Sequence, residues 1–525
     1  MIEQSHVSIW KCGFVFIKIG EKKLMEFSTA TNGETTCTEN GFRLHSYYNP
    51  SKEAERFCNT AECSFYPRYV LVTEPALSYC VPFLKKKFSN AILCCIRFSK
   101  EFESTNSSWD KIFYAYGKSQ KTNPLLEEEI FNFMGDEGIS ACLFLSWKPS
   151  ENPFKELYEF SWEEIKKAVL KSRSVLATRT FFSKRWTKNA LRFSMFCKNT
   201  ALIKNGTSDI VVCASGPSLK SDIPFLKKYR ERFFLIAVSS SLSPLIFNGI
   251  TPDLCISTDG GYWAKLHLVQ LCNSKKIPLA LPGEASCFAS ILESTNIIPL
   301  FYGDGCSEEI LKASGYSGHS AFRNGSVSGT AAYLALSITS GKIFYCGLDL
   351  SFSKGFSHTQ PNELEKRNSV FDNRIRTSET RNFSSEINTT SINIYKTWFS
   401  SNDFFGRIFR LSDNFNYDSE LGKIKNVDWT FFEKQTFDFK NNTKPQVIET
   451  QNIFKKEQRI NFLRDTVIKN ISNPEWIKNA LPAEAISLER CKDLCEKEKI
   501  EKRIQEGMKI FFCDIMKALG RNVAI

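Results

Sequence analysis

Three loops of small polar residues in this sequence could contribute to a ligand-binding site. They are residues 215–219 (SGPSL), 257–261 (STDGG) and 324–329 (NGSVSG). Each follows an extended stretch and precedes a candidate helix, and in the third loop the free N–H groups and dipole of that helix favour an anion such as phosphate. Ser and Gly are also ordinary capping residues, so one such loop alone is weak evidence for a ligand. Three of them at equivalent strand ends favour a shared binding site.

Individual residues in these loops suit that role. Gly216 lets the backbone approach a ligand, Pro217 fixes the turn, and Ser218 can cap the next helix. Asp259 supplies a carboxylate directly after a buried strand. The turn from Ser326 to Gly329 opens a helix, and we expect it to bind a phosphate.

A fourth polar segment follows the last candidate strand. It runs GLDLSF from Gly347 to Phe352 and KGFSH from Lys354 to His358. The Asp349 carboxylate can cap backbone N–H groups in this turn or contact a ligand, and the residue pattern leaves both roles open.

The elements that carry these loops alternate between strand and helix from Asp209 to Phe352. Strand candidates are residues 210–214, 233–238, 254–257, 278–281, 298–301 and 342–346, and helix candidates are residues 223–230, 242–247, 262–272, 285–292, 308–313 and 330–339. This alternation is typical of a Rossmann-like α/β domain with a mostly parallel sheet. Ligands of such sheets bind beyond the carboxyl ends of the strands, where the polar loops lie.

The flanking segments predict two further domains. Residues 1–160 contain a small α/β pattern without a glycine-rich phosphate loop, so we assign them a scaffolding or partner-binding role. Residues 161–375 hold the Rossmann-like domain with its leading helices. Residues 376–525 begin with a long irregular insertion and end in a helical domain.

Composition narrows the class of protein. The 525 residues are 42% apolar and 24% charged, and the 69 basic against 57 acidic residues give a net charge of +12. This excess is too small and dispersed to indicate nucleic-acid binding. No apolar run is long enough for a membrane span, and Met1 to Gly13 lacks a signal-peptide pattern. The 18 cysteines include no C-x-x-C pair, which favours reduced thiols, no metal site and a cytoplasmic location.

Four segments carry a resemblance to a known family. They are VVCASGPSL (211–219), the pair TPD (251–253) with STD (257–259), the block 325–335, and GLDLSFSKGFSH (347–358). Together they resemble the motility-associated factor (Maf) family of bacterial flagellin glycosyltransferases, with spirochaete members as the nearest. The resemblance is strong from about Arg185 to His358, a third of the chain, and the flanking domains match that family's three-part layout.

The resemblance implies transfer of a nonulosonic (sialic-like) acid from its CMP conjugate to Ser or Thr of flagellin, with no cofactor or metal required. The central domain would then be sialyltransferase-like. Gly216, Pro217 and Ser218 correspond to its nucleotide-binding turn, the Ser328–Gly329 pair to a CMP contact, and Gly347 to a backbone contact with the base.

The sequence departs from the sialyltransferase pattern at three positions. Asn residues that line CMP in those enzymes correspond here to Ser215, Ser239 and Asp259. Hydroxyls and a carboxylate cannot reproduce an amide's paired donor and acceptor, which leaves the identity of the nucleotide or its pose open.

Attack by a hydroxyl on the sugar asks for a base that works near neutral pH. His319 and His358 flank the proposed site, and His358 matches a His of the Maf pattern. We therefore expect His358 to be the base, with His319 as the alternative.

Two other classes of function stay open. The GPSL and TDGG segments also resemble archaeal-type 6-hydroxymethylpterin pyrophosphokinases, where Asp259 and Asp304 could hold magnesium and ATP. That family's His-rich segment is replaced here by FYGDGC (301–306), so we rank the kinase below the transferase. A non-catalytic scaffold that binds flagellin, and a homo-oligomer, are also compatible with the sequence.

Overall fold

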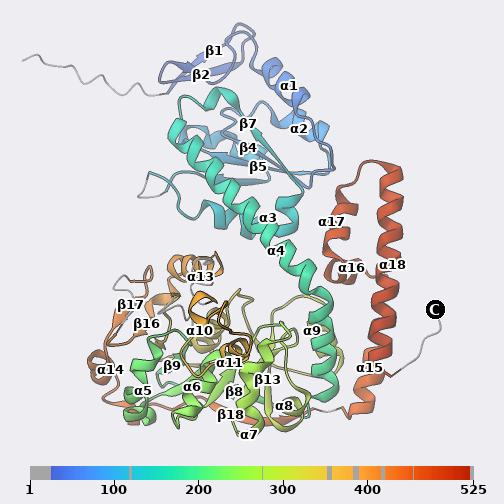
Figure 1. Cartoon of the computed structure of the whole chain (residues 1–525). Helices are drawn as coiled ribbons and strands as arrows, with labels where there is room; N and C mark the ends of the chain where they lie inside the picture. The colour runs from blue at the N-terminus through green and yellow to red at the C-terminus, as the bar shows by residue number, and fades with distance from the viewer. Residues whose placement is uncertain are drawn as a thin grey trace, which may run out of the picture. The chain divides into compact units, whose positions relative to one another are not determined.

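The computed structural model describes residues 25–117, 121–274, 276–351, 358–381, 390–414, 420–452 and 454–520. Contacts group the chain into two units (Figure 1). The N-terminal unit is Met1–Ala177 with Ile486–Ile500, and the central unit is Thr178–Ala485 with Glu501–Ile525. Residues 161–177 and 486–500 thus group with the N-terminal unit, although the sequence assigned them to the second and third segments. The division into three functional segments stays a prediction.

The N-terminal unit contains the small α/β fold that the sequence indicated. Its parallel sheet has the order β6-β5-β4-β7. A three-stranded antiparallel sheet, β1-β2-β3, precedes it in the sequence. The strands are β1 (Glu26–Thr29), β2 (Thr35–Glu39), β3 (Phe42–Arg43), β4 (Tyr69–Thr73), β5 (Ile92–Arg97), β6 (Lys111–Tyr114) and β7 (Cys142–Ser146). The helices are α1 (Pro50–Thr60), α2 (Val81–Lys87), α3 (Leu126–Ser140) and the first part of α4 (Lys155–Phe196).

Alternate side chains of β4 and β5 fall into two apolar clusters, one on each face of this sheet. Burial on both faces is what a parallel sheet between helices requires. Helix α2 begins only at Val81, because Glu74, Ala76 and Ser78 all have positive φ and form an irregular loop after β4.

The central unit is built on one long, mostly parallel sheet. Its order is β17-β16-β15-β9-β10-β11-β12-β13-β8-β18, with the short β14 also paired to β13. The strands are β8 (Asn199–Lys204), β9 (Ile210–Cys213), β10 (Phe234–Val238), β11 (Leu254–Ile256), β12 (Leu279–Pro282), β13 (Asn296–Phe301), β14 (His319–Ser320), β15 (Ile343–Cys346), β16 (Ile408–Leu411), β17 (Lys425–Val427) and β18 (Gln446–Gln451). All pairs are parallel except β18 with β8.

Helices follow most of these strands. They are α5 (Leu219–Lys228), α6 (Leu242–Phe247), α7 (Val269–Asn273), α8 (Ala289–Ser294), α9 (Cys306–Ala313), α10 (Val327–Ile338), α11 (Glu363–Ser369), α13 (Thr390–Ser401) and α14 (Trp429–Gln435), with 3₁₀ turns η4 (Ser239–Ser241) and η5 (Ala264–Leu268). The C-terminal helices are α15 (Lys456–Asn470), α16 (Pro474–Ala480), α17 (Pro482–Arg490) and α18 (Leu494–Ala518). Apolar residues of α10 pack against β9, β10 and β15 in the main core.

The α/β fold class and its mostly parallel sheet are confirmed. The prediction of an irregular stretch from residue 376 is wrong in part, because β16, β17 and β18 extend both edges of the sheet there. These strands are three to six residues long, and Arg410 and Lys425 interrupt their apolar pattern. Short edge strands of this kind lack the continuous apolar run that marks a buried parallel strand.

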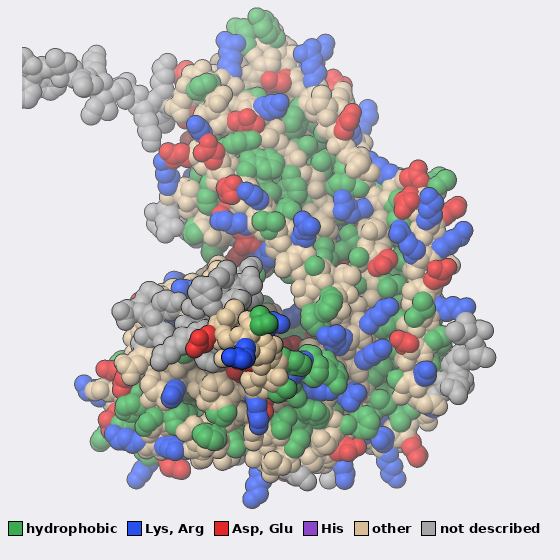
Figure 2. Space-filling model, in the orientation of Figure 1, with side chains coloured by type: hydrophobic (Ala, Val, Ile, Leu, Met, Phe, Trp, Pro, Cys, Tyr) green, Lys and Arg blue, Asp and Glu red, His purple; other side chains and the backbone are tan. Residues whose placement is uncertain are grey.

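Within the described ranges, no helix is both long and apolar enough to cross a membrane. Figure 2 shows Lys and Arg side chains interspersed with Asp and Glu over the visible face. This distribution agrees with the mild, dispersed charge expected from the sequence.

Candidate functional site

The central sheet has a topological switch point between β9 and β15. From β9 the chain adds β10, β11, β12 and β13 on one side, whereas β15, β16 and β17 are added on the other side. The loops that leave such neighbouring strands separate, and ligands of open α/β sheets bind in the resulting crevice at the carboxyl ends. Residues 214–219 and 347–350 leave β9 and β15 at this point.

Backbone contacts fix these two loops against each other. The Gly216 N–H donates to the Gly347 carbonyl at 2.8 Å. A Cβ on Gly216 would lie 2.5 Å from that same oxygen, and Gly347 itself has a φ of +68°. Both positions therefore require glycine. The turn expected at Gly216 is present, with the backbone that follows β15 beside it, and the approach of a ligand there stays a prediction.

Asp349 holds the Gly216–Ser218 turn. Its Oδ2 accepts the Ser218 N–H at 2.7 Å, and the side chain is buried. Burial raises the pKa of Asp349, and the hydrogen bonds from Ser218 oppose that rise. Asp349 thus caps a backbone N–H of the neighbouring 215–219 loop, whereas the sequence placed its cap in its own turn; contact with a ligand stays a prediction. Ser218 donates its backbone N–H to this carboxylate, and its side chain makes no cap bond to α5.

Ser215, Ser240 and His358 form a short chain of polar side chains above the end of β9. The Ser215 Oγ lies 2.8 Å from the Ser240 Oγ and 2.8 Å from the His358 Nδ1. The next residue, Thr359, donates its N–H to the Ser215 carbonyl and its hydroxyl to the Gly216 carbonyl. These bonds bring His358, far along the chain, to the switch point. Residues 352–357, within the segment that carries the family resemblance, lie outside the described residues.

His358 is neutral at physiological pH. Burial lowers its pKa to about 4, and the nearby His267 adds to that shift. The two rings meet edge to face with centroids 6.3 Å apart, and burial lowers the pKa of His267 to about 4 as well. A neutral imidazole has a lone pair that can accept a proton, which a base requires. A pKa of about 4 lies below the near-neutral value expected of a general base, and a bound phosphate would raise it by favouring the protonated form.

The N-terminus of α10 points to the same edge of the sheet. Ser326 caps the helix, because its Oγ accepts the Gly329 N–H at 3.0 Å. Tyr345, on β15, donates its hydroxyl to the Ser328 carbonyl at 2.7 Å, which ties this turn to the switch point. A Cβ on Gly329 would collide with the Asn324 side chain. Packing inside the turn is therefore enough to require a glycine at 329. Phosphate binding at this turn stays a prediction.

Ser239 and Asp259 lie at neighbouring strand ends. Ser239 is buried in η4, directly after β10. Asp259 is exposed after β11, and its Oδ1 accepts the Gly261 N–H at 2.7 Å. Burial raises the pKa of Tyr395, on α13, and the charge of the nearby Asp259 raises it further. The Tyr395 ring would also contact a Cβ on Gly325, at 3.1 Å.

His319 is not brought to this group. It lies on β14, which pairs with β13, and its Nε2 accepts the Ile203 N–H of β8 at 2.8 Å. At about 4.8 Å per strand, β13 is roughly 19 Å from β9. The imidazole thus ties two neighbouring segments of the sheet together, and its pKa is lowered by burial.

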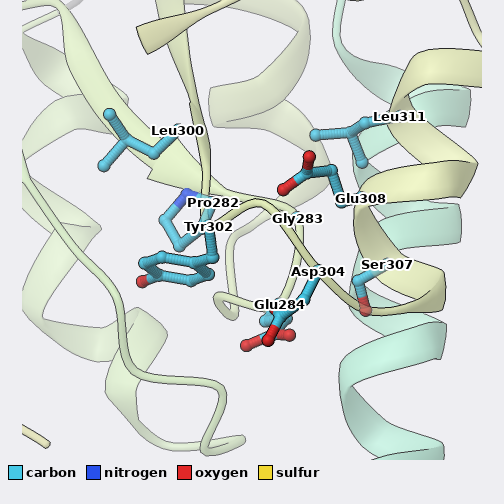
Figure 3. A pocket seen from close by; sticks show the side chains of 9 residues that line it. All are labelled: Pro282, Gly283, Glu284, Leu300, Tyr302, Asp304, Ser307, Glu308 and Leu311. Atoms are coloured by element: carbon cyan, nitrogen blue, oxygen red, sulfur yellow. The ribbon is translucent and has the colours of Figure 1, made fainter. Parts of the chain in front are cut away.

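A small pocket lies further along the same edge, after β12 and β13. It is lined by Pro282, Gly283, Glu284, Leu300, Tyr302, Asp304, Ser307, Glu308 and Leu311 (Figure 3). Arg323 binds both Glu284 oxygens, at 2.9 and 2.7 Å, and the Asp304 Oδ1 at 2.6 Å. Its guanidinium also lies 4.7 Å from the Tyr302 ring centroid. The Glu284 and Asp304 carboxylates are thus engaged with Arg323, which immediately precedes the Asn324–Gly329 turn, whereas Glu308 accepts the Gly303 N–H and pairs with Lys312.

Several of these residues were not singled out from the sequence. Ser240 and Thr359 sit beside predicted residues, and the run of three Ser from 239 to 241 after β10 is a signal that could have been used. Arg323 and Tyr395 carry no recognisable spacing, because their partners come from other loops. Among the residues that the structure describes, no group of three or more His, Cys, Asp or Glu side chains could hold a metal ion.

Comparisons with known proteins agree with the resemblance seen in the sequence. Residues 184–355 match the family model described as 6-hydroxymethylpterin diphosphokinase MptE-like. A protein of Treponema pallidum (strain Nichols), described as uncharacterized, is 29% identical over 320 residues, which cover 60% of this chain and 70% of the relative. The solved structure of the Maf glycosyltransferase from Magnetospirillum magneticum AMB-1 is 11% identical, with a TM-score of 0.54 over 95% of this chain and 92% of that one. These matches confirm the Maf and MptE-like resemblance.

Proposed function

Since residues 184–355 form an MptE-like domain in a chain with the fold of a Maf glycosyltransferase, we propose that this protein transfers a sugar. Its donor is a CMP-activated nonulosonic acid, and its acceptors are Ser or Thr hydroxyls of flagellin. The observation that carries the proposal is the Ser215–His358 pair at the switch point, beside the glycine turn that follows β9. It combines a site for a nucleotide with a neutral imidazole.

The proposed reaction assigns one role to each group. The acceptor hydroxyl attacks the anomeric carbon, its proton passes to the His358 Nε2, and the bond from that carbon to the CMP phosphate breaks. In the matching tautomer, the His358 Nδ1–H donates to the Ser215 Oγ, which in turn donates to Ser240. This hydrogen bond would leave the Nε2 lone pair free to take the proton. The N-terminus of α10 is the proposed site for the departing phosphate.

Mass analysis tests the transfer itself. Flagellin from cells that carry the gene is expected to be heavier than flagellin from cells that lack it, by whole sugar units. His358→Ala in the gene should restore the lighter mass. Identical masses in all strains would contradict the flagellin acceptor.

The family match to a pyrophosphokinase model favours one second candidate, an ATP- and magnesium-dependent enzyme. Its acidic candidates, Asp259 and Asp304, are engaged with the Gly261 N–H and with Arg323. Thermal melts separate the two candidates. CMP at a hundredfold excess over its Kd should add about 2.7 kcal/mol of apparent stability with or without a chelator.

The opposite pattern would favour the kinase. A magnesium-dependent shift with ATP and none with CMP would overturn the transferase proposal, and Asp259→Asn should then erase that shift. Asp253→Asn serves as a matched control, because Asp253 bonds the Leu235 N–H and the Arg230 side chain near the amino ends of β10 and β11.

A further inference from the structure

An exposed aromatic and cationic surface follows β11, directly after the STDGG loop. Trp263 is 47% exposed, and the Arg367 guanidinium lies over its ring at 3.6 Å from the centroid. Tyr262 is 53% exposed and meets Trp263 edge to face. We call Tyr262, Trp263 and Arg367 the aromatic rim. Stacking on a ring holds a guanidinium in place and leaves its N–H edge available for a planar anion.

The acids around Arg367 are engaged elsewhere. Glu363, one turn earlier on α11, lies within hydrogen-bond distance of Ser243 and Gln270. Glu365 pairs with Arg381 at 2.6 Å. Within the described part of the chain, Arg367 forms no ion pair. Arg323, by contrast, already binds two carboxylates. The rim thus presents a positioned guanidinium whose charge is not neutralised by a neighbouring side chain.

The rim lies on two segments of the chain that also carry residues of the switch-point group or its neighbours. β11 is two strands from β9, which is about 10 Å at 4.8 Å per strand. His267, in η5, meets the His358 ring edge to face, and Trp263 immediately precedes η5. The same segment that brings His358 to Ser215 continues into α11 and Arg367. A donor with its nucleotide at β9 and β15 could therefore extend its sugar toward the rim.

We infer that the aromatic rim binds the carboxylate of the donor sugar, with Arg367 as the residue that selects acidic sugars. This inference rests on the proposed function, because it takes the nucleotide to be bound at the switch point. Arginine recognises a carboxylate through two parallel N–H···O bonds, which a neutral hexose cannot form. The Trp263 ring fixes the guanidinium and offers an apolar face to the sugar.

Calorimetry on the full chain tests the rim with two probes, CMP and CMP-N-acetylneuraminic acid. The wild type should bind the CMP-sugar more tightly than CMP. Arg367→Gln should weaken the CMP-sugar at least tenfold and change the Kd for CMP by less than twofold. The affinity of Arg367→Lys for the CMP-sugar should lie between those of the wild type and Arg367→Gln, because lysine keeps the charge and lacks the planar guanidinium. Lys366→Gln, on the same helix with the same loss of charge, is the control and should behave as wild type.

Each outcome decides the inference. Unchanged binding of the CMP-sugar by Arg367→Gln, or equal weakening of both probes, would overturn it and leave the proposed function standing. The same holds if the wild type binds the CMP-sugar no more tightly than CMP. Failure of the wild type to bind CMP would remove the proposed function and the inference together.

Discussion

Both units contain a parallel sheet with a switch point, but the described side chains at the two points differ in kind. In the N-terminal unit the switch lies between β4 and β7. Glu74, directly after β4, pairs with Arg97 at the end of β5 at 3.0 Å, and both side chains are 0% exposed. Hydroxyls, glycines and an imidazole occupy the equivalent place in the central unit. The same topology thus supports a filled crevice in one unit and a candidate site in the other.

The buried Arg97 of the N-terminal unit finds all its hydrogen-bond partners within that unit. Arg97 donates to Glu74, the Ala76 carbonyl, Ser78, Thr105 and Asn106. Such a complete set of partners leaves no donor for a ligand. Positive φ at three positions between residues 74 and 78 shapes the loop around the guanidinium. In the central unit, Ser215 bonds the Ser240 hydroxyl and the His358 ring. A ligand could take the place of one of these bonds.

The largest expected effect comes from breaking the buried pair. Glu74→Gln leaves the Arg97 charge buried without its counterion, which typically costs about 3–5 kcal/mol. Because a chain of two units need not unfold in one step, hydrogen exchange of the β4–β7 amides is the measurement. Glu489→Gln is the control, because its pair with Arg68 is 4.0 Å long and exposed, and should cost less than about 1 kcal/mol. Equal exchange in both variants would show that the pair does not stabilise this crevice.

The next effect concerns chemistry at the switch point of the central unit. His358→Ala should lower kcat about a hundredfold, the usual scale for loss of a general base, with little change in donor affinity. His319→Ala is the matched comparison, because its imidazole bonds the Ile203 N–H and should affect stability before turnover. A His358→Ala enzyme at the wild-type rate beside an inactive His319→Ala enzyme would reverse the two roles.

The pH dependence of stability sharpens the same contrast. His267 has a folded pKa of about 4 against an ordinary value of 6.5, so the unfolded state binds more protons between these values. Its contribution is present above pH 6.5 and lost as the pH falls toward 4, about 1 kcal/mol by pH 5.5. His267→Gln should remove that part of the loss, measured as hydrogen exchange of β10 and β11 amides at pH 7.5 and 5.5. An unchanged difference between the two pH values would contradict the buried, neutral state of His267.

The sequence predicted the central strands well and the site only in part. Runs such as IVVC at β9 are apolar on both faces, so local composition alone marks them as buried parallel strands. Gly216 was singled out from its place in a turn after a strand and Gly347 through the family resemblance; the structure shows their backbones in contact, and their contacts with a nucleotide stay predictions. His358 was selected through the family pattern, because nothing local to it indicates its bond with Ser215.

Long-range pairings explain what the sequence could not reveal. Arg323 meets Glu284 and Asp304 through three different loops, and Arg367 meets Trp263 across about a hundred residues. The Glu74–Arg97 pair depends on a loop with three left-handed residues, none of which is glycine. Side-chain partners of this kind are fixed by tertiary packing and leave no periodic trace.

The smallest expected effect tests whether the Ser240–Ser215 hydrogen bond helps to position His358 at the switch point of the central unit. Ser240 touches the site through one hydrogen bond, from its Oγ to the Ser215 Oγ at 2.8 Å. A single neutral bond contributes about 1 kcal/mol, so Ser240→Ala should lower kcat about fivefold by loosening Ser215 against His358. Ser241→Ala is the control, because that hydroxyl bonds the Cys213 and Val238 carbonyls and should reduce stability without a selective loss of turnover. A Ser240→Ala enzyme with full activity would mean that His358 is held by Ser215 and Thr359 alone, and the contrast with the fully bonded Arg97 crevice would then rest on fewer groups.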